Sequence, residues 1–492
     1  MFQNMFSKKD TSKVLLRDNV SPKVLQTKYD VRGEIYLAAV KRANEGKEVI
    51  YTNVGNPHAL GEQPLTFNRQ VLSLVMAPFL LNDPRVNSMY PSDAIARARE
   101  YLRHVKGGLG AYSDSRGNPY IRQEIADFIQ RRDGVTASPD KIFVSNGASE
   151  CVRMFLNCII RGPNDGVMVP IPQYPLYSAS IALYGGEMVG YYLDEDTTWS
   201  LDMDILRSSL AAARAKGITV RALVYINPGN PTGQCLNKEN VENLLRFCHD
   251  NRMVLCADEV YQANIYTPKA FVSARKTLAS MPEPYRSNTE LVSFHSVSKG
   301  PFGECGLRGG YIEFHNIDDG FIDEMYKLAS VNLSPNVTGQ VALGLMVNPP
   351  RPGQPSHNQY QSEVRRCIES LKRRARRIVD AFNSMEGVSC QPTEGAMYSF
   401  PRIRLPRKFI ERAKSLGKSP DVLYCLELLD ETGLSCVPGS GFQQVPGTFH
   451  IRTTILPKED KFDDIVGRFK SFHEGFIRRY GKPEPEAPRS RL

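Results

Sequence analysis

The chain has 492 residues, of which 41% are hydrophobic and 23% charged, with a formal net charge of +9. This length and composition exclude a disordered chain and predict a globular protein, either two domains around a cleft or one large domain with a small one appended. The longest apolar run, residues 71–81, is too short to cross a bilayer and is broken by Pro78, so we expect no membrane passage. The basic residues are spread along the chain, which favours a solvated surface and attraction for anionic substrates over binding to nucleic acid.

The cysteines and the two ends of the chain bear on its location. The N-terminus lacks the apolar core of a secretory signal, and the ten cysteines include no C-x-x-C pair. We therefore expect free thiols in a reducing compartment and a cytoplasmic protein. The last three residues, Ser490, Arg491 and Leu492, resemble a peroxisomal targeting signal. A location in a peroxisome-like microbody therefore stays open as the alternative.

The predicted elements divide the chain into four parts. Residues 1–30 are polar and form an arm, residues 31–92 begin a smaller domain, residues 93–345 form a large domain, and residues 346–492 complete the smaller one. In the large domain, a helix begins at Asn118 and Pro119 and ends before Gly134. Short apolar strands follow at residues 141–145, 167–169, 222–226, 253–257 and 291–294, separated by helical segments. This alternation predicts an α/β fold with a mostly parallel, doubly wound sheet.

The composition changes after residue 350, where a Pro- and Gly-rich segment is followed by a long basic helix over residues 368–382. Shorter strands are predicted near residues 395–400 and 450–455. These features indicate a small α+β domain.

Polar motifs follow four of the predicted strands of the large domain. They are residues 146–150, which open a helix, residues 227–233, a stiff turn that fixes Asn230, residues 258–261, which begin with Asp258, and the loop that holds Lys299. Ligands in such sheets bind beyond the carboxyl ends of the strands. Each motif alone could be ordinary turn chemistry, but together they predict one binding site for an anionic cofactor.

Lys299 is the most informative residue of this set. It lies on a tight loop with Ser296, Ser298 and Arg308, whose hydroxyl and guanidinium groups suit a dianionic phosphate. A lysine in this setting is placed to hold an aldehyde as a Schiff base. The alternative for this fragment alone is a solvated lysine in a glycine-rich turn.

Taken together, the motifs resemble those of the class I and II aminotransferases, which belong to the fold-type I superfamily of pyridoxal-phosphate enzymes. The superfamily motifs are YINPGNPTG (225–233), ADEVY (257–261), and SVSK (296–299) followed by GLRG (306–309). Three longer stretches resemble the alanine aminotransferase group most closely: residues 295–311, 111–117 and 333–340. The resemblance runs from about residue 30 to about residue 475 and implies a large cofactor-binding domain with a smaller α+β domain.

The resemblance implies the roles of the residues around the cofactor ring. Lys299 would hold pyridoxal 5'-phosphate covalently and, once released, move a proton from the substrate Cα to the cofactor. Asp258 would pair with the pyridinium nitrogen and keep it protonated. Tyr261 and Asn230 would bind the phenolic oxygen, and Tyr174 would stack on the ring, with a role in core packing as the alternative for Tyr174.

The resemblance also implies how the phosphate is bound. The backbone of Ala148 and Ser149, the Ser296 hydroxyl and Arg308 would hold it. Tyr112 would reach the phosphate of a neighbouring subunit, which implies a homodimer with shared active sites.

For the substrate, the resemblance implies a bidentate pair between Arg452 and the α-carboxylate, with the backbone of Gly55 and the amide of Asn230 close by. Without the resemblance, an exposed strand arginine is an equal interpretation of Arg452. We identify no second arginine for a distal carboxylate. How one site would accept both alanine and glutamate is therefore not visible in the sequence.

The sequence predicts transamination of L-alanine and 2-oxoglutarate to pyruvate and L-glutamate, by a ping-pong cycle through pyridoxamine phosphate. The partners are small amino and keto acids, and we expect no nucleic acid, membrane or metal. Another aminotransferase of the family, of the glutamate–glyoxylate or kynurenine type, or a lyase acting at Cβ, remains open. A non-catalytic binding protein is a further alternative, although no helix-turn-helix segment precedes residue 93.

Overall fold

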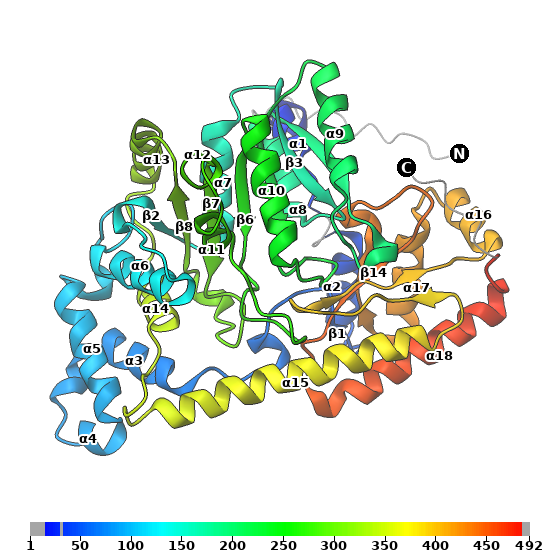
Figure 1. Cartoon of the computed structure of the whole chain (residues 1–492). Coiled ribbons are helices and arrows are strands. Elements are labelled where there is room, and N and C mark those ends of the chain that lie inside the picture. The colour runs from blue at the N-terminus through cyan, green and yellow to red at the C-terminus, as the bar shows by residue number, and fades with distance from the viewer. Residues whose placement is uncertain (1–14, 30–32, 485–492) are drawn as a thin grey trace.

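The computed structural model describes residues 15–29 and 33–484 (Figure 1). The C-terminal tripeptide with Ser490, and residues 1–14 and 30 of the predicted arm, lie outside the described residues. The strands are β1 (Ile50–Tyr51), β2 (Ile142–Ser145), β3 (Asp165–Ile171), β4 (Glu187–Tyr192), β5 (Thr219–Ile226), β6 (Val254–Asp258), β7 (Leu291–Ser296), β8 (Gly310–His315), β9 (Val388–Ser389), β10 (Tyr398–Ser399), β11 (Arg402–Ile403), β12 (Leu434–Ser435), β13 (Val437–Pro438) and β14 (Ile451–Thr454).

The helices connect and cover these strands. They are α1 (Pro22–Gln26), α2 (Glu34–Asn44), α3 (Thr66–Met76), α4 (Val86–Met89), α5 (Ser92–His104), α6 (Pro119–Asp133), α7 (Ala148–Ile159), α8 (Pro175–Tyr184), α9 (Met203–Ala215), α10 (Lys238–Asn251), α11 (Ala274–Ala279), α12 (Tyr285–Asn288), α13 (Asp319–Val331), α14 (Val337–Val347), α15 (His357–Asn383), α16 (Arg407–Ser415), α17 (Pro420–Thr432) and α18 (Phe462–Tyr480). Among the described residues, no helix is both long and apolar enough to span a membrane.

A seven-stranded sheet with the order β2-β8-β7-β6-β5-β3-β4 forms the centre of the large domain. Strands β4, β3, β5, β6 and β7 are parallel to one another, and β8 is antiparallel to both β7 and β2. The predicted α/β fold with a mostly parallel sheet is confirmed. The edge strand β4 was not predicted, because it is buried along one face only and lacks the continuous apolar run of the inner strands.

Apolar side chains on both faces of the sheet explain why the inner strands read as continuous hydrophobic runs. On β5, Ala222, Val224 and Ile226 pack with α7, α8 and α13, whereas Leu223 and Tyr225 pack with α9 and α10. In Figure 1, α9 and α10 lie in front of the sheet and α7 behind it. The sheet is therefore covered on both faces, and a ligand is expected at the carboxyl ends of its strands.

Helix α6 illustrates how local sequence sets the element boundaries. The side chain of Asn118 accepts a hydrogen bond from the backbone N–H of Tyr120, and Pro119 occupies the first helical position. Gly134 ends the helix with φ of 72°, a conformation that glycine adopts without steric cost. Both predicted ends of this helix are confirmed.

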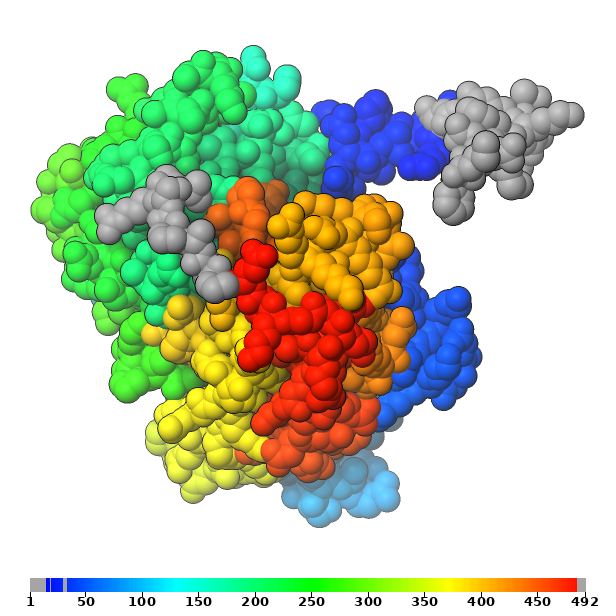
Figure 2. All heavy atoms as spheres, turned by 90° about the vertical axis from the view of Figure 1, so that its right-hand side faces the viewer, coloured from blue at the N-terminus to red at the C-terminus, as the bar shows by residue number. Residues whose placement is uncertain are grey.

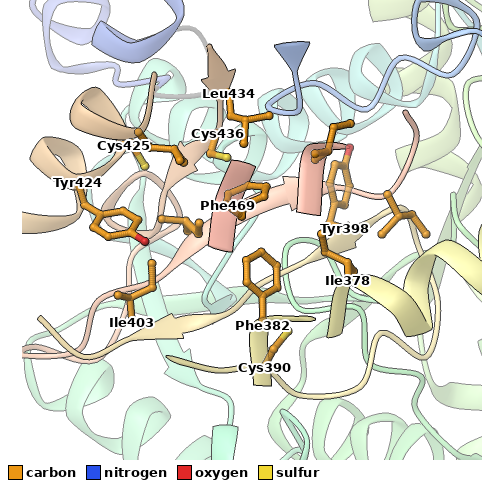
Figure 3. Close-up of a cluster of buried hydrophobic side chains, with 14 of the residues drawn as sticks. Ile378, Phe382, Cys390, Tyr398, Ile403, Tyr424, Cys425, Leu434, Cys436 and Phe469 are labelled. Carbon is orange, nitrogen blue, oxygen red and sulfur yellow. The ribbon is translucent and has the colours of Figure 1, made fainter. Parts of the chain in front are cut away.

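A second hydrophobic core lies beside the sheet and defines the small domain. It is built by α2, α15, α17 and α18 together with β10 and β14 (Figure 3). Figure 2 shows α16 and α18, coloured orange to red, on one face below the green large domain. Helices α3 and α5 instead share a core with α6 and α14 at the β2 edge of the sheet. The domain boundaries expected from the sequence stay a prediction.

The N-terminal segment enters the small domain through β1, which pairs in parallel with β12 so that Ile50 lies opposite Leu434. The backbone N–H of Thr52 then donates to the carbonyl oxygen of Ser435, 3.0 Å away. This pairing fixes the start of residues 52–56, the segment that runs on to the strand ends of the large domain.

Candidate active site

A cavity of about 330 Å³ lies where the carboxyl ends of β5, β6 and β7 meet the N-terminus of α7 and the small-domain strand β10. Every predicted site residue except Tyr112 and Arg452 lines it. These residues are Gly55, Ala148, Ser149, Tyr174, Asn230, Asp258, Tyr261, Ser296, Lys299 and Arg308. The cavity therefore brings together residues that are far apart in the sequence, such as Gly55 and Lys299, which are 244 residues apart.

Lys299 follows β7 and extends into this cavity. Its Nζ atom donates a hydrogen bond to the carbonyl oxygen of Gly55, 2.8 Å away, and lies 5.6 Å from the ring centre of Tyr261. The amine is thus held between the large-domain loop and the segment after β1. The alternative of a lysine in a solvated turn is wrong, because the side chain lines the cavity.

Asp258 ends β6 and is 5% exposed. The hydroxyl of Tyr177 donates to its carboxylate over 2.7 Å, and no ion pair reaches it from the residues the structure describes. Burial raises the pKa of Asp258 to about 6, although the hydrogen bond from Tyr177 favours the charged form. A buried carboxylate of this kind suits a ligand that brings its own positive charge, such as a protonated ring nitrogen.

Another part of the cavity wall is suited to an anion. Ala148 and Ser149 begin α7, a helix of 12 residues, and so present free backbone N–H groups. Arg308 crosses this helix end and donates to the carbonyl oxygens of Asn146 and Cys305. It can do so because residue 147 is glycine, where a Cβ would lie 2.2 Å from the Arg308 Nη2 atom.

Arg452 is not among the residues that line the cavity and is 2% exposed. Its two terminal nitrogens donate to Asn230 Oδ1 at 3.1 Å and to the carbonyl oxygen of Asn53 at 2.6 Å. Its Nε atom is buried without a hydrogen-bond partner among the described residues. The alternative of an exposed arginine on a strand is therefore wrong.

Tyr398 was missed by the sequence analysis although it lies on a predicted strand. It lines the cavity from β10, and its ring covers the Arg452 guanidinium at 4.2 Å. The Tyr261 hydroxyl donates to the Tyr398 hydroxyl over 3.3 Å. A tyrosine on a short strand carries no signal of function in a sequence, because aromatic residues are common in buried strands.

Two predicted residues have surroundings that the sequence did not indicate. Tyr174 lines the cavity, and its hydroxyl lies 3.1 Å from that of Tyr29, beyond the end of α1. Tyr112 is 77% exposed and does not line the cavity of its own chain. Its expected role at a neighbouring subunit stays a prediction.

Known proteins with related sequences and folds share this architecture. The family model described as aminotransferase class I and II matches residues 79–469. Glutamate–glyoxylate aminotransferase 1 of Arabidopsis thaliana is 56% identical over 95% of this chain and 98% of its own, and alanine aminotransferase 2 of Panicum miliaceum is 49% identical over 94% and 98%. The solved structure of an alanine aminotransferase from Pyrococcus furiosus has a TM-score of 0.74 at 24% identity, covering 93% of this chain and 100% of its own.

The chain belongs to the class I and II aminotransferases. It is an aminotransferase that uses pyridoxal 5'-phosphate. The cavity suits that cofactor, because its wall combines a buried carboxylate that no cation pairs among the described residues with a helix N-terminus and an arginine. The amine of Lys299 lines the same cavity.

Proposed function

We propose that the protein transfers the amino group of L-alanine to 2-oxoglutarate, which gives pyruvate and L-glutamate in two half-reactions. The name and 49% identity of the Panicum miliaceum relative support this choice of substrates. The observation that carries the chemistry is the position of the Lys299 amine in a cavity that also contains buried Asp258. Such a site binds an aldehyde cofactor and keeps a positive charge on its ring.

The bound cofactor supplies an electron sink for the electron pair of the substrate Cα–H bond. Lys299 would take the proton from the substrate Cα and return it to the bound cofactor, as a positioned amine acting as base and acid. Asp258 would pair with the ring nitrogen and keep that nitrogen protonated. Tyr261 and Asn230 line the same cavity as Asp258 and would bind the phenolic oxygen.

Anionic groups would be bound at two separate places. The N-terminus of α7, Ser296 and Arg308 would hold the phosphate, since free N–H groups and a guanidinium favour a dianion. Arg452 would receive the substrate α-carboxylate, because its Nε atom, which has no partner among the described residues, is a donor that a carboxylate would satisfy. The backbone of Gly55, against the Lys299 amine, then lies beside the bound amino acid.

Glutamate–glyoxylate transamination is the second candidate, and the 56% identity of the Arabidopsis thaliana relative favours it. The two reactions need the same residues around the cofactor. They differ only in the amino donor and in the keto acid that fits beside Arg452.

The substrates can be separated by measuring turnover of the purified protein. Alanine and glutamate are each offered with pyruvate, 2-oxoglutarate and glyoxylate. Rapid turnover of alanine with 2-oxoglutarate supports the first candidate, and preference for glutamate with glyoxylate would replace it by the second. Release of ammonia instead of amino transfer marks a lyase and contradicts both.

The cofactor attachment is tested independently by borohydride reduction and peptide mapping. The label is expected on Lys299. Lys269, an exposed lysine paired with Glu394, serves as the internal control and should stay unlabelled. Label on any other residue, or none, would overturn the proposed mechanism.

We also propose that the protein works as a homodimer in which Tyr112 completes the partner's phosphate site. A large exposed tyrosine outside its own cavity supports this. In a mixture of Tyr112→Ala and Lys299→Ala chains, each hybrid dimer would then contain one intact site and recover activity. If Tyr112 served its own chain, every hybrid site would carry one lesion and activity would not return.

We propose a cytoplasmic location, which the ten unpaired cysteines support because thiols stay reduced there. A fluorescent fusion at the N-terminus, with and without the last three residues, tests the alternative. Punctate fluorescence that depends on Ser490, Arg491 and Leu492 would contradict a cytoplasmic location.

A further inference from the structure

His450 is a buried histidine whose two ring nitrogens both face hydrogen-bond acceptors. Its Nε2 atom lies 3.0 Å from the Glu195 carboxylate, and its Nδ1 atom lies 2.9 Å from Gln444 Oε1. The amide of Gln444 is oriented by its own donation to Asp421 Oδ2, 3.2 Å away, so its oxygen faces the ring. An imidazole between two acceptors donates from both nitrogens and is then positively charged. The Glu195 carboxylate is shared with a second cation, because Arg402 Nη1 lies 3.8 Å from its other oxygen.

The two hydrogen bonds of His450 join segments that are far apart in the chain. Glu195 begins η7 (Glu195–Thr197), which follows the edge strand β4 of the seven-stranded sheet. Gln444 follows η9 (Gly439–Phe442), which comes directly after β13. The imidazole is therefore held from one side by the sheet edge and from the other by the chain after β13.

A stack of aromatic rings runs from His450 to the guanidinium of Arg452. The imidazole lies parallel to the ring of Phe400, with the ring centres 4.7 Å apart and the planes inclined by 2°. Phe400 packs edge to face with Phe442, with ring centres 5.8 Å apart. The guanidinium carbon of Arg452 lies 4.6 Å from the centre of the Phe442 ring and 4.2 Å from that of Tyr398. These rings are at most 3% exposed, so a displacement of one ring in such a close-packed interior displaces the next.

The backbone couples His450 to Arg452 as well. His450 directly precedes β14, and Arg452 is the second residue of that strand, so the two side chains lie on the same face. The N–H of Gly439 donates to the His450 carbonyl oxygen over 2.7 Å, and Val437 lies opposite Arg452 on β13. A Cβ atom built on Gly439 would be 2.8 Å from the His450 Cβ atom, so glycine at this position permits the close approach.

The orientation of the Arg452 guanidinium decides how well it can bind a carboxylate, because a bidentate pair requires the two groups to be coplanar. The terminal nitrogens already donate to Asn230 and Asn53, and the flat faces pack on aromatic rings, so the neighbouring side chains set this plane.

We propose that His450 is a positioning residue for Arg452. Held by Glu195 and Gln444, it fixes the ring stack against which the guanidinium packs, and so keeps Arg452 aligned with the substrate α-carboxylate. His450 does not line the cavity and therefore acts only through Arg452. The inference rests on the proposed transamination and adds to it a residue that determines how tightly the α-carboxylate is bound.

The substitution His450→Phe tests this role, because it keeps an aromatic ring against Phe400 and removes both hydrogen bonds. We expect KM for alanine to rise about tenfold with kcat nearly unchanged, since the carboxylate is bound alike in the ground state and in the transition state. A readout that does not depend on turnover is calorimetry of the holoenzyme with propionate, which has the carboxylate of alanine but no amino group. The dissociation constant of propionate should rise by the same factor as KM.

His473→Phe is the matched control. His473 is 1% exposed, and its two ring nitrogens contact the Tyr424 hydroxyl and the Glu386 carbonyl oxygen. It lies on α18 and packs against Tyr424 and Phe476 instead of the rings beside Arg452. This variant should melt at a lower temperature and still bind alanine and propionate as the wild type does.

Glu195→Gln is a second variant that keeps the test decisive if His450→Phe does not fold. The glutamine has the size of the glutamate and still offers an oxygen to the Nε2–H group, but the negative charge opposite the imidazole is gone. A hydrogen bond between charged groups is about twice as strong as a neutral one, so the ring is held less firmly. We expect KM for alanine and the dissociation constant of propionate to rise about threefold, with kcat nearly unchanged.

Unchanged KM and propionate affinity in His450→Phe, or in Glu195→Gln if only that variant folds, would overturn the proposal. Equal losses of propionate affinity in His450→Phe and His473→Phe would overturn it too, because the effect would then come from general destabilisation. The two levels of inference fail in different ways. If borohydride does not label Lys299, the proposed transamination fails. If Lys299 is labelled and propionate binding is unchanged, only the role of His450 fails.

Discussion

The amine nitrogen of Lys299 donates to the backbone carbonyl oxygen of Gly55, which lies 2.8 Å away and 244 residues earlier in the chain. This contact joins the loop after β7 to the segment that β1 and β12 hold in the small domain. The reactive amine is therefore positioned by both domains. Changes in either segment should alter the chemistry without unfolding the sheet.

The first prediction concerns Gly55. In Gly55→Ala, the new methyl group would lie 2.1 Å from the Tyr398 hydroxyl and 3.0 Å from Lys299 Nζ, so at least one side chain must move. We expect at least a tenfold loss of kcat/KM, about 1.4 kcal/mol in transition-state stabilisation, with a small change in melting temperature. Steady-state kinetics and thermal melts measure the two effects. In the control Gly306→Ala the added methyl group meets nothing within 4 Å, and equal losses in both variants would contradict the prediction.

The second prediction concerns cofactor binding at the N-terminus of α7. Gly147→Ala would place a methyl group 2.2 Å from Arg308 Nη2 and should displace the guanidinium from the phosphate site. We expect the affinity of the apoprotein for pyridoxal phosphate to fall about tenfold or more, measured by fluorescence titration. Gly134→Ala controls for a positive φ alone, because Gly134 has φ of 72° but no atom within 4 Å of the added methyl group, and thermal melts of both variants measure the larger strain at Gly147. Equal affinities of the two variants would show that Arg308 is not involved.

The third prediction uses the pH dependence of Asp258. Its pKa is raised to about 6 in the folded apoprotein, so the native state binds this proton more tightly than the unfolded chain does. The corresponding stabilisation is full below about pH 4 and is lost as the pH rises through about 6. In wild-type apoprotein the free energy of unfolding should fall by about 3 kcal/mol over this pH range, and in Asp258→Asn this fall should be absent. The asparagine oxygen still accepts the hydrogen bond from the Tyr177 hydroxyl.

Urea unfolding of both apoproteins between about pH 4 and pH 7 measures that difference. The same substitution should weaken cofactor binding, because the ring nitrogen loses its anionic partner. Identical pH slopes for the two apoproteins would contradict the raised pKa of Asp258.

The fourth prediction concerns the loop that follows Lys299. Arg69 on α3 makes two hydrogen bonds, of 2.7 and 2.8 Å, to Glu304, whose side chain is 4% exposed. Arg69→Ala leaves that carboxylate buried without this partner and should cost about 2 kcal/mol, less than a fully buried pair because the Arg69 side chain is half exposed. Chemical denaturation measures the loss. The double variant Arg69→Ala with Glu304→Gln should recover part of this lost stability. If its loss equals the sum of the losses in the two single variants, the two side chains are not coupled.

The sequence predicted most of the sheet and most of the cavity wall for one physical reason. Strands buried on both faces leave continuous apolar runs, and the polar residues that follow them must meet at one edge of a parallel sheet. That reasoning located Asn230, Asp258 and Lys299 without any knowledge of packing between domains. The helix signals at Asn118 and Gly134 were equally local.

What the sequence did not show depends on contacts between distant segments. The ring of Tyr398 stacks on the Arg452 guanidinium, and the Tyr29 hydroxyl contacts that of Tyr174. Each contact joins distant parts of the chain that share no local sequence pattern. These contacts follow from the arrangement of whole elements, so they become visible only in three dimensions. The edge strand β4 was missed for a different reason, because it is half exposed and lacks an apolar run.

The parallel pairing of β1 with β12 has a consequence for biosynthesis. Residues 52–56 find their place only when residues near 434 are available, so the amine of Lys299 has no acceptor at Gly55 until the chain has been synthesised beyond residue 434. The sheet can fold earlier, since its strands end at residue 315. The residues at the N-terminus of α7 can therefore be arranged before the pairing that places Gly55 against Lys299.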